Sequence, residues 1–154
     1  MSNGQSDLQS ARSSLPPQAS SSGKALNIVL WILQAILAVF FVTIGSIKFL
    51  TPAERLAQMF RWTGEHPTLV IITATSDILI GLGLLLPALT RIAPRLTVIA
   101  IVGGCLLQLC AITFHLSRGE PITINLVILP LLLFLLWGRG WRLPISARRR
   151  TAAE

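Results

Sequence analysis

Lys48 and Asp77 are the two residues of this chain whose types and surroundings point most directly to chemistry, because both are ionisable and both lie within long hydrophobic segments. A charged side chain near the centre of a bilayer costs about 3 kcal/mol or more. We therefore expect these two side chains to pair with each other, to take part in a function, or both. His115 is a third candidate, at the end of another apolar segment. Together a carboxylate, an amine and an imidazole could carry protons, or could hold a quinone carbonyl or a small anion.

The composition is that of a membrane protein. The chain has 154 residues, of which 53% are hydrophobic and only 12% are charged, and its mean hydropathy is +0.71. These values exclude a soluble globular protein and predict helical membrane spans in one domain. The formal net charge is +7, but the basic residues cluster beside the hydrophobic segments. We therefore expect contacts with the lipid bilayer and no nucleic-acid partner.

The apolar segments predict an all-α fold, a bundle of four transmembrane helices within residues 26–143. The predicted spans are residues 28–50, 68–89, 96–116 and 122–137. The fourth is short for the ~17–25 residues that cross the hydrocarbon. Residues 1–25 are rich in Ser, Gln and Pro and predict a disordered tail, and residues 144–154 form a basic tail. The positive-inside rule predicts a multi-pass membrane protein with both tails in the cytoplasm.

The first outer loop contains a short predicted helix. Thr51–Glu54 has the pattern of a capping box, with proline at the first helical position. Leu56, Met59 and Phe60 would then share one face, and Gly64 would end the helix. We expect an amphipathic helix that lies on the outer interface or caps the bundle, and a lid over a site is the sharper hypothesis.

Helix geometry places the three ionisable candidates in one half of the membrane. Asp77 lies about 13 Å below the outer boundary at 1.5 Å per residue, and Lys48 and His115 lie within about one turn of that boundary. Because helical side chains lean toward the N-terminus of their own helix, Lys48 and His115 lean into the bilayer and Asp77 leans toward them. We expect these residues to meet in a polar pocket in the outer half of the membrane. Its predicted edge consists of Gln34, Gln108 and Asn125. Helix packing is the alternative role for these three amides.

An ordered set of motifs resembles the DoxX and DoxX-like membrane proteins. The motifs are Leu30–Gln34, Phe40, Gly45–Lys48, Asp77–Pro87, His115, Arg118–Glu120 and Asn125. The resemblance covers residues 28–140 and implies a four-helix inner-membrane protein. Relatives include a small subunit of a thiosulfate:quinone oxidoreductase and membrane partners of redox enzymes. Many relatives have glutamate at the position of Asp77, and some have arginine at the position of Gln34.

Three hypotheses follow for the function. The one we favour is a non-catalytic subunit or accessory protein of a quinone-linked membrane redox system. It would have no intrinsic cofactor, a bound quinone, a redox-enzyme partner subunit and a homo-oligomeric state. The second is a small oligomeric proton-coupled transporter or exporter in which Asp77 and His115 relay protons. The third is a structural membrane protein whose polar residues only set helix packing.

An autonomous enzyme is not expected. The sequence contains no nucleophile with an adjacent base and no nucleotide-binding motif. Cys105 and Cys110 lie in one apolar stretch without the spacing of a redox dithiol or a metal site. We therefore expect no metal site and no disulfide.

Overall fold

The structure is a computed structural model that describes residues 21–93 and 95–146. Its elements, in chain order, are the helices α2 (Ser21–Leu50), α3 (Ala53–Met59), α4 (Trp62–Glu65), α5 (Pro67–Thr90), α6 (Arg95–Ser117) and α7 (Thr123–Trp137), followed by the π-helix η1 (Gly138–Arg142). Within these residues four helices are long and apolar enough to cross a membrane. The predicted all-α bundle of four spans is therefore confirmed.

The predicted tails lie mostly beyond the residues that the structure describes. Residues 1–20 and 147–154 are outside it, so the predicted disorder of the N-terminal tail stays a prediction for residues 1–20. Residues 21–25, however, belong to α2, so the helix starts earlier than the predicted boundary at residue 26. Once the long apolar run has formed a helix, each further residue adds a hydrogen bond at little cost, and the helix extends into the polar segment.

The fourth span is longer than predicted. Helix α7 ends at Trp137, but η1 continues the same rod, so the apolar helical segment covers 20 residues from Thr123 to Arg142. The amide of Leu143 donates to the carbonyl oxygen of Gly138 at 2.7 Å, which closes the wide turn. At Gly138 the backbone lies directly against Leu30 of α2, and a Cβ atom at this position would clash with the side chain of Leu30. A glycine at this position lets the last turn of the fourth span pack onto α2.

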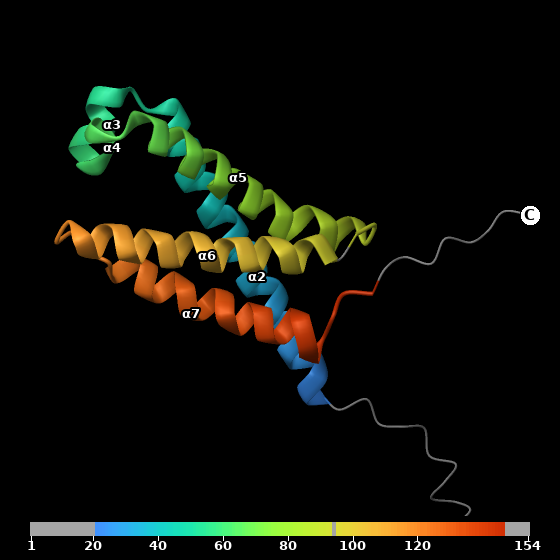
Figure 1. Ribbon diagram of the computed structural model, residues 1–154. Coiled ribbons are helices and arrows are strands. Elements are labelled where there is room, and N and C mark those ends of the chain that lie inside the picture. The colour runs from blue at the N-terminus through green and yellow to red at the C-terminus, as the bar shows by residue number, and fades with distance from the viewer. Residues whose placement is uncertain (1–20, 94, 147–154) are drawn as a thin grey trace, which may run out of the picture.

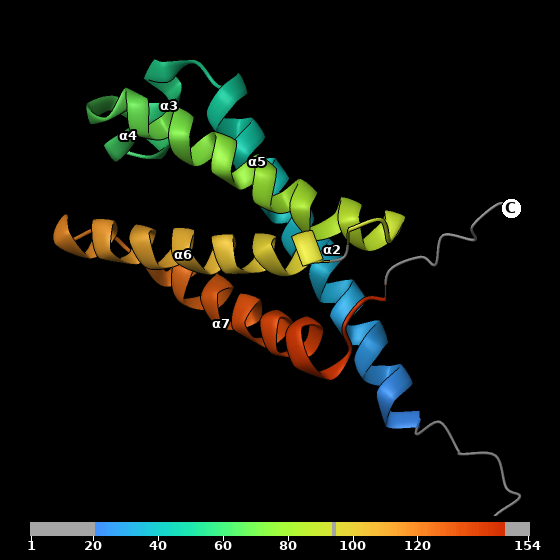
Figure 2. The same ribbon diagram turned by 45° about the vertical axis from the view of Figure 1, so that its right-hand side comes forward.

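Helices α2 and α5 pack side by side, and α6 and α7 form a second pair (Figures 1 and 2). Helices α5 and α6 lie close together at the turn that joins them and diverge toward the other end of the bundle. We call that other end the loop end, because α3, α4 and the turn between α6 and α7 lie there. The terminal end is the opposite one, where α2 begins and η1 ends. The helices that carry Lys48 and Asp77 are thus direct neighbours.

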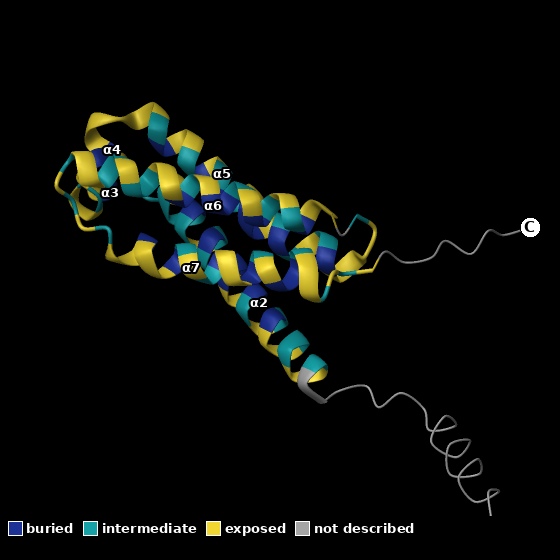
Figure 3. Cartoon of the chain, turned by 60° about the horizontal axis from the view of Figure 1, so that its bottom comes forward, coloured by how far each residue is buried: buried dark blue, intermediate teal, exposed yellow. Residues whose placement is uncertain are grey.

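The bundle is apolar inside and outside, as expected for helices in lipid. Its core is formed by buried side chains from all four spans, namely Leu30, Leu37, Phe41, Ile80, Leu84, Ile101, Ile128, Leu132 and Leu135. The outward faces carry exposed aliphatic side chains, such as Ile36, Val39, Leu79, Leu109 and Leu133. Figure 3 shows these exposed faces along the length of the bundle. In lipid there is little hydrophobic drive between helices, so close packing and polar contacts must hold the spans together.

Two glycines bring α2 and α5 into backbone contact. A Cβ atom at Gly45 would lie 2.8 Å from the carbonyl oxygen of Ala74, and one at Gly81 would lie 2.8 Å from that of Ala38. Neither distance is tolerated by a side chain, so only glycine permits this approach. The contact lies one turn from Lys48 on α2 and one turn from Asp77 on α5, and it brings these two positions together.

The first loop differs in detail from its prediction. The helical segment breaks at Phe60, whose backbone is extended, so two short helices form and the first ends at Met59 rather than at Gly64. The predicted capping box is wrong, because Pro52 occupies the N-cap position and no side chain caps α3. The predicted apolar face is narrower as well, since Leu56 is buried but Met59 is 54% exposed.

The α3–α4 segment caps the bundle at the loop end. Leu56 of α3 and Trp62 of α4 form a small hydrophobic cluster with Val70 of α5, and Phe114 of α6 packs against it. Two positions were predicted for this segment, one on the outer interface and one that caps the bundle, and the structure shows the second. It closes the end of the bundle where α5 and α6 diverge.

Candidate functional site

The structure brings Lys48 and Asp77 into direct contact. Lys48 Nζ donates to Asp77 Oδ2 at 2.7 Å, and the two side chains are only 11% and 6% exposed. Neither charge could be held so deep without the other, because an unpaired charge in a low-dielectric site is strongly unfavourable. The pair therefore links α2 to α5 and places one positive and one negative group inside the loop half of the bundle.

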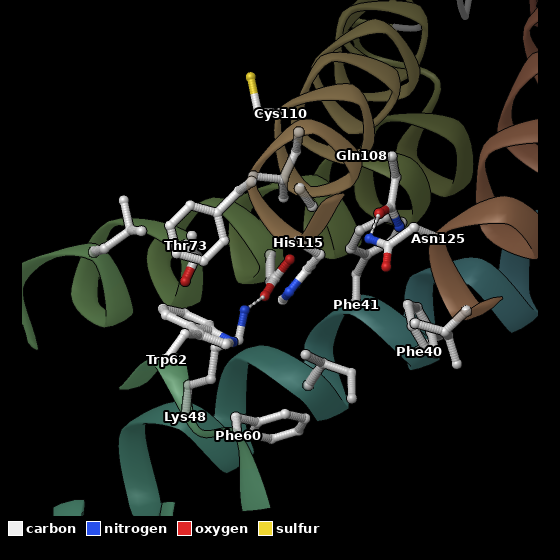
Figure 4. Close-up of a pocket in the computed structure, with 17 residues that line it drawn as sticks. Phe40, Phe41, Lys48, Phe60, Trp62, Thr73, Gln108, Cys110, His115 and Asn125 are labelled. Carbon is white, nitrogen blue, oxygen red and sulfur yellow. Dashed lines mark hydrogen bonds and ion pairs between the residues drawn. The ribbon is translucent and has the colours of Figure 1, made fainter. Parts of the chain in front are cut away.

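The ion pair forms part of the wall of a cavity of ≈ 380 Å³. Every long helix and the α3–α4 segment contribute to this cavity, which we call the inner pocket. Its lining includes the aromatic residues Phe40, Phe41, Phe60, Trp62 and Phe114 and the polar residues Lys48, Thr73, Asp77, Gln108, His115 and Asn125. Figure 4 shows Trp62 and His115 beside Lys48. The inner pocket is thus mainly apolar, with a few convergent polar groups, as small-molecule sites are.

His115, Gln108 and Asn125 also line the inner pocket, as the sequence predicts. Asn125 Nδ2 donates to Gln108 Oε1 at 2.7 Å, and both side chains are buried (Figure 4). His115 forms its hydrogen bond away from Asp77, because its Nδ1 lies 2.6 Å from Glu120 Oε2. The amides therefore connect α6 with α7, while the imidazole faces both the pocket and the loop that follows α6.

Gln34 lies elsewhere, which corrects its predicted position at the edge of the pocket. Its side chain is fully buried, but it donates to the backbone oxygen of Leu84 and accepts from Arg139 Nε at 3.1 Å. Gln34 precedes Lys48 by about 21 Å along the helix axis. Helical periodicity correctly placed the two residues on the bundle-facing side of α2, but that distance puts Gln34 in the terminal half.

The sequence did not reveal the aromatic wall of the pocket. Trp62 lies over the ion pair, with Lys48 Nζ 5.7 Å from the centre of its ring. Its ring also meets Phe114 edge-on at 5.9 Å between centroids, and His115 at 6.4 Å. The only signal in the sequence was an aromatic residue near the end of the predicted loop helix. Its position over Lys48 depends on how the α3–α4 segment folds back onto the bundle.

A second cavity of ≈ 930 Å³ adjoins the inner pocket at the loop end. We call it the vestibule. It shares five lining residues with the inner pocket, namely Phe60, Trp62, His115, Ile124 and Asn125. Its other walls come from the α3–α4 segment and the turn between α6 and α7. The shared residues form the partition between a polar outer space and an apolar inner one.

Charged side chains tie the two walls of the vestibule together. Arg118 Nη2 donates to Glu65 Oε2 at 2.7 Å, and its Nε donates to Glu120 Oε1 at 3.0 Å. Glu120 also contacts His115. We call these four residues the loop clasp. The hydrogen bond from Arg118, and to a smaller extent that from His115, holds the pKa of Glu120 below its usual range, so this carboxylate is charged at neutral pH.

Breaking the loop clasp should loosen the α3–α4 segment. In Arg118→Gln we expect amide hydrogen exchange in residues 53–65 to rise by about three- to fivefold, the range expected for a partly exposed ion-pair network. Hydrogen-exchange mass spectrometry of the protein in lipid nanodiscs would measure it, with Arg55→Gln, an exposed arginine on α3, as the matched control. Equal exchange in both variants would contradict the clasp.

Acid should weaken the clasp in a defined direction. Because the pKa of Glu120 is lower in the folded protein than in the unfolded chain, its contribution is fully present above the ordinary glutamate pKa. That contribution is lost as the pH falls through the folded-state value. Exchange in residues 53–65 of the unmodified protein should therefore approach that of Arg118→Gln only in acid.

Four apolar spans around a mainly apolar pocket with a buried ion pair define a multi-pass integral membrane protein. A family model described as the DoxX-like family matches residues 32–138, which is more than half of the chain. The protein therefore belongs to the DoxX-like family, as the motifs indicated. No curated protein and no solved structure matches it.

Proposed function

We propose that this protein is a non-catalytic subunit or accessory protein of a quinone-linked membrane redox system, and that its inner pocket holds the quinone. The observation that supports this most strongly is a buried ion pair in the wall of a mainly apolar cavity that is rich in aromatic side chains. The volume of ≈ 380 Å³ lies within the ~300–1,000 Å³ of small-molecule sites. Membership of the DoxX-like family is consistent with such a role.

The residues of the inner pocket fit a quinone head group. An ammonium group has three N–H donors, and Lys48 uses one of them on Asp77, so two remain for a carbonyl oxygen. Trp62 and Phe114 offer aromatic surface to a flat ring. When bound, the quinone would supply two-electron, two-proton redox chemistry. The protein's own residues would bind the ring, orient it and keep water away from it.

The vestibule suggests where a partner would act. It lies on the loop-end side of the partition, which includes Trp62 and His115, and its walls carry the charged loop clasp. We propose that a redox-enzyme partner subunit contacts this end of a homo-oligomeric protein. We also propose that the chain resides in the inner membrane with both termini in the cytoplasm, since that orientation agrees with the positive-inside rule.

We place the proton-coupled transporter second. That hypothesis requires Asp77 and His115 to exchange protons, whereas His115 forms its hydrogen bond with Glu120. It predicts a pH-dependent solute flux in vesicles that Asp77→Asn abolishes. Unchanged flux in Asp77→Asn would remove the transporter hypothesis.

Trp62 provides a direct probe for the proposed quinone. A short-chain ubiquinone analogue titrated into the protein in nanodiscs should quench tryptophan fluorescence in a saturable manner, because Trp62 lines the inner pocket. Trp31, Trp137 and Trp141 belong to the terminal half, so Trp62→Phe should remove the saturable component and leave only gradual quenching from quinone dissolved in the lipid.

A paired variant tests whether the ion pair takes part. In Lys48→Met/Asp77→Leu we expect the saturable quenching to disappear while Trp62 remains in place. Purely linear quenching, equal in the unmodified protein and in this variant, would overturn the quinone proposal.

A further inference from the structure

Arg139 lies at the terminal end of the bundle, far from the inner pocket, and the proposed function makes no use of it. It is the second residue of η1 and is only 3% exposed, whereas Arg142 in the same short helix is exposed. Its guanidinium lies over the ring of Trp31, 5.0 Å from the ring centre. The side chain therefore points into the bundle against α2, although an arginine at the end of a span could reach the polar interface.

Two neutral amides of α2 orient the Arg139 side chain. Gln34 donates to the backbone oxygen of Leu84, so its own oxygen is directed at Arg139 and accepts from Nε at 3.1 Å. Asn27 accepts from Nη1 at 2.8 Å, in a hydrogen bond that is only partly buried. The guanidinium is thus held firmly on one side by Gln34 and at its outer edge by Asn27.

The positive charge of Arg139 is not neutralised by the part of the chain that the structure describes. No Asp or Glu of residues 21–93 or 95–146 lies within ion-pair distance of it. Its Nη2 atom is buried and has no hydrogen-bond partner. A buried guanidinium surrounded only by neutral groups is unfavourable, and a negatively charged oxygen at the same place would be strongly favoured.

We infer that Arg139 and Asn27 form a binding site for a phosphate oxyanion, supplied by the headgroup of an anionic phospholipid. The Nη1–Nη2 edge of a guanidinium is the edge that binds two oxygens of a phosphate in parallel. On this side Nη2 has no partner and Nη1 has only Asn27. The partly buried bond to Asn27 marks the side from which the phosphate enters, and the amide then turns its NH₂ group toward the phosphate.

The position of the cluster favours a headgroup over a free ion. The fourth span ends at Arg142, so Arg139 lies at the depth where headgroup phosphates occur. Exposed Lys24 and Arg142 lie on the same two elements and add positive charge, which attracts anionic lipid. Free inorganic phosphate has the same chemistry, and the experiment separates the two sources.

The full chain, stripped of lipid in a neutral detergent, is titrated with phosphatidylglycerol and with phosphatidylcholine, and bound lipid is counted by native mass spectrometry. We expect one phosphatidylglycerol per chain to bind at least tenfold more tightly than phosphatidylcholine. Arg139→Gln should remove this preference, since charge-assisted hydrogen bonds carry it. Arg142→Gln, the matched control, should change the affinity by less than about threefold.

Two further measurements identify the origin of the bound phosphate group and cover the case in which a variant does not fold. A different result would identify free phosphate as the ligand instead of the headgroup. In that result the protein binds the two lipids equally, and inorganic phosphate competes at low millimolar concentration. If Arg139→Gln does not fold, Arg139→Lys takes its place in the test. Lysine keeps the positive charge but lacks the two parallel N–H donors, so this variant should bind phosphatidylglycerol severalfold more weakly. Equal phosphatidylglycerol binding by the unmodified protein and by the folded Arg139 variant would overturn the site.

Discussion

Asp77→Asn alone should destabilise the bundle by about 3 kcal/mol, because Lys48 would remain buried without a negative partner. The two side chains are 11% and 6% exposed, so bulk water would compensate little for the lost carboxylate. The free energy of unfolding in mixed micelles, followed by circular dichroism during a denaturant titration, measures this effect. Arg55→Met, which removes an exposed charge from α3, should change it by no more than about 0.5 kcal/mol.

The paired variant Lys48→Met/Asp77→Leu should recover most of that loss. Replacing both members of a buried ion pair with apolar side chains removes the desolvation cost together with the attraction, and the net effect is often near neutral. The comparison separates stability from function, since the paired variant is expected to fold but not to bind the quinone. If Asp77→Asn were as stable as the unmodified protein, the ion pair would not have the energetic role that its burial implies.

Gly81→Ala should cost about 2 kcal/mol, as overpacking of a close helix contact does. The new Cβ atom would lie 2.7 Å from Val42 Cγ2 and 2.8 Å from the carbonyl oxygen of Ala38. The second neighbour is backbone and cannot rotate away, so α2 and α5 must separate. Because the same contact sets the distance between Lys48 and Asp77, we expect saturable quinone quenching to weaken as well.

Gly103→Ala on α6 is the matched control. Nothing lies within 4 Å of the Cβ atom that it would add. Alanine is the better helix former, so this variant should be unchanged or more stable by up to about 1 kcal/mol. Both variants are compared by the same denaturant titration. Equal stabilities for Gly81→Ala and Gly103→Ala would contradict the close packing of α2 on α5.

The contact between Lys48 and Asp77 was accessible from the sequence because depth in a membrane follows from counting residues. A helix rises 1.5 Å per residue and its side chains lean toward its N-terminus, so two ionisable residues in neighbouring spans can be compared directly. The same counting shows Gln34 to be too far from Lys48 to share a pocket. The polar side chain of Gln34 and its place on the bundle-facing side of α2 suggested a position at the edge of the pocket. The distance between Gln34 and Lys48 along the helix axis excludes that position.

Trp62 and Arg139 could not be placed in the same way. Trp62 follows a break in the loop helix at Phe60, and its position over Lys48 depends on packing against residues distant in sequence. Arg139 lies past the end of the predicted fourth span, where a basic residue indicates topology. The π-helical turn carries it inward to Gln34, and no local pattern predicts that turn.

The measurement that tests the central claim most directly is purification of the unmodified protein and of Lys48→Met/Asp77→Leu in native lipid. It is followed by mass spectrometry of everything that stays bound and by a visible absorption spectrum. We expect quinone to remain with the unmodified protein, together with a haem- or flavin-bearing partner, and to be lost from the folded paired variant. A clean oligomer without quinone or partner, or equal quinone in both samples, would contradict the proposal that the inner pocket serves a redox system.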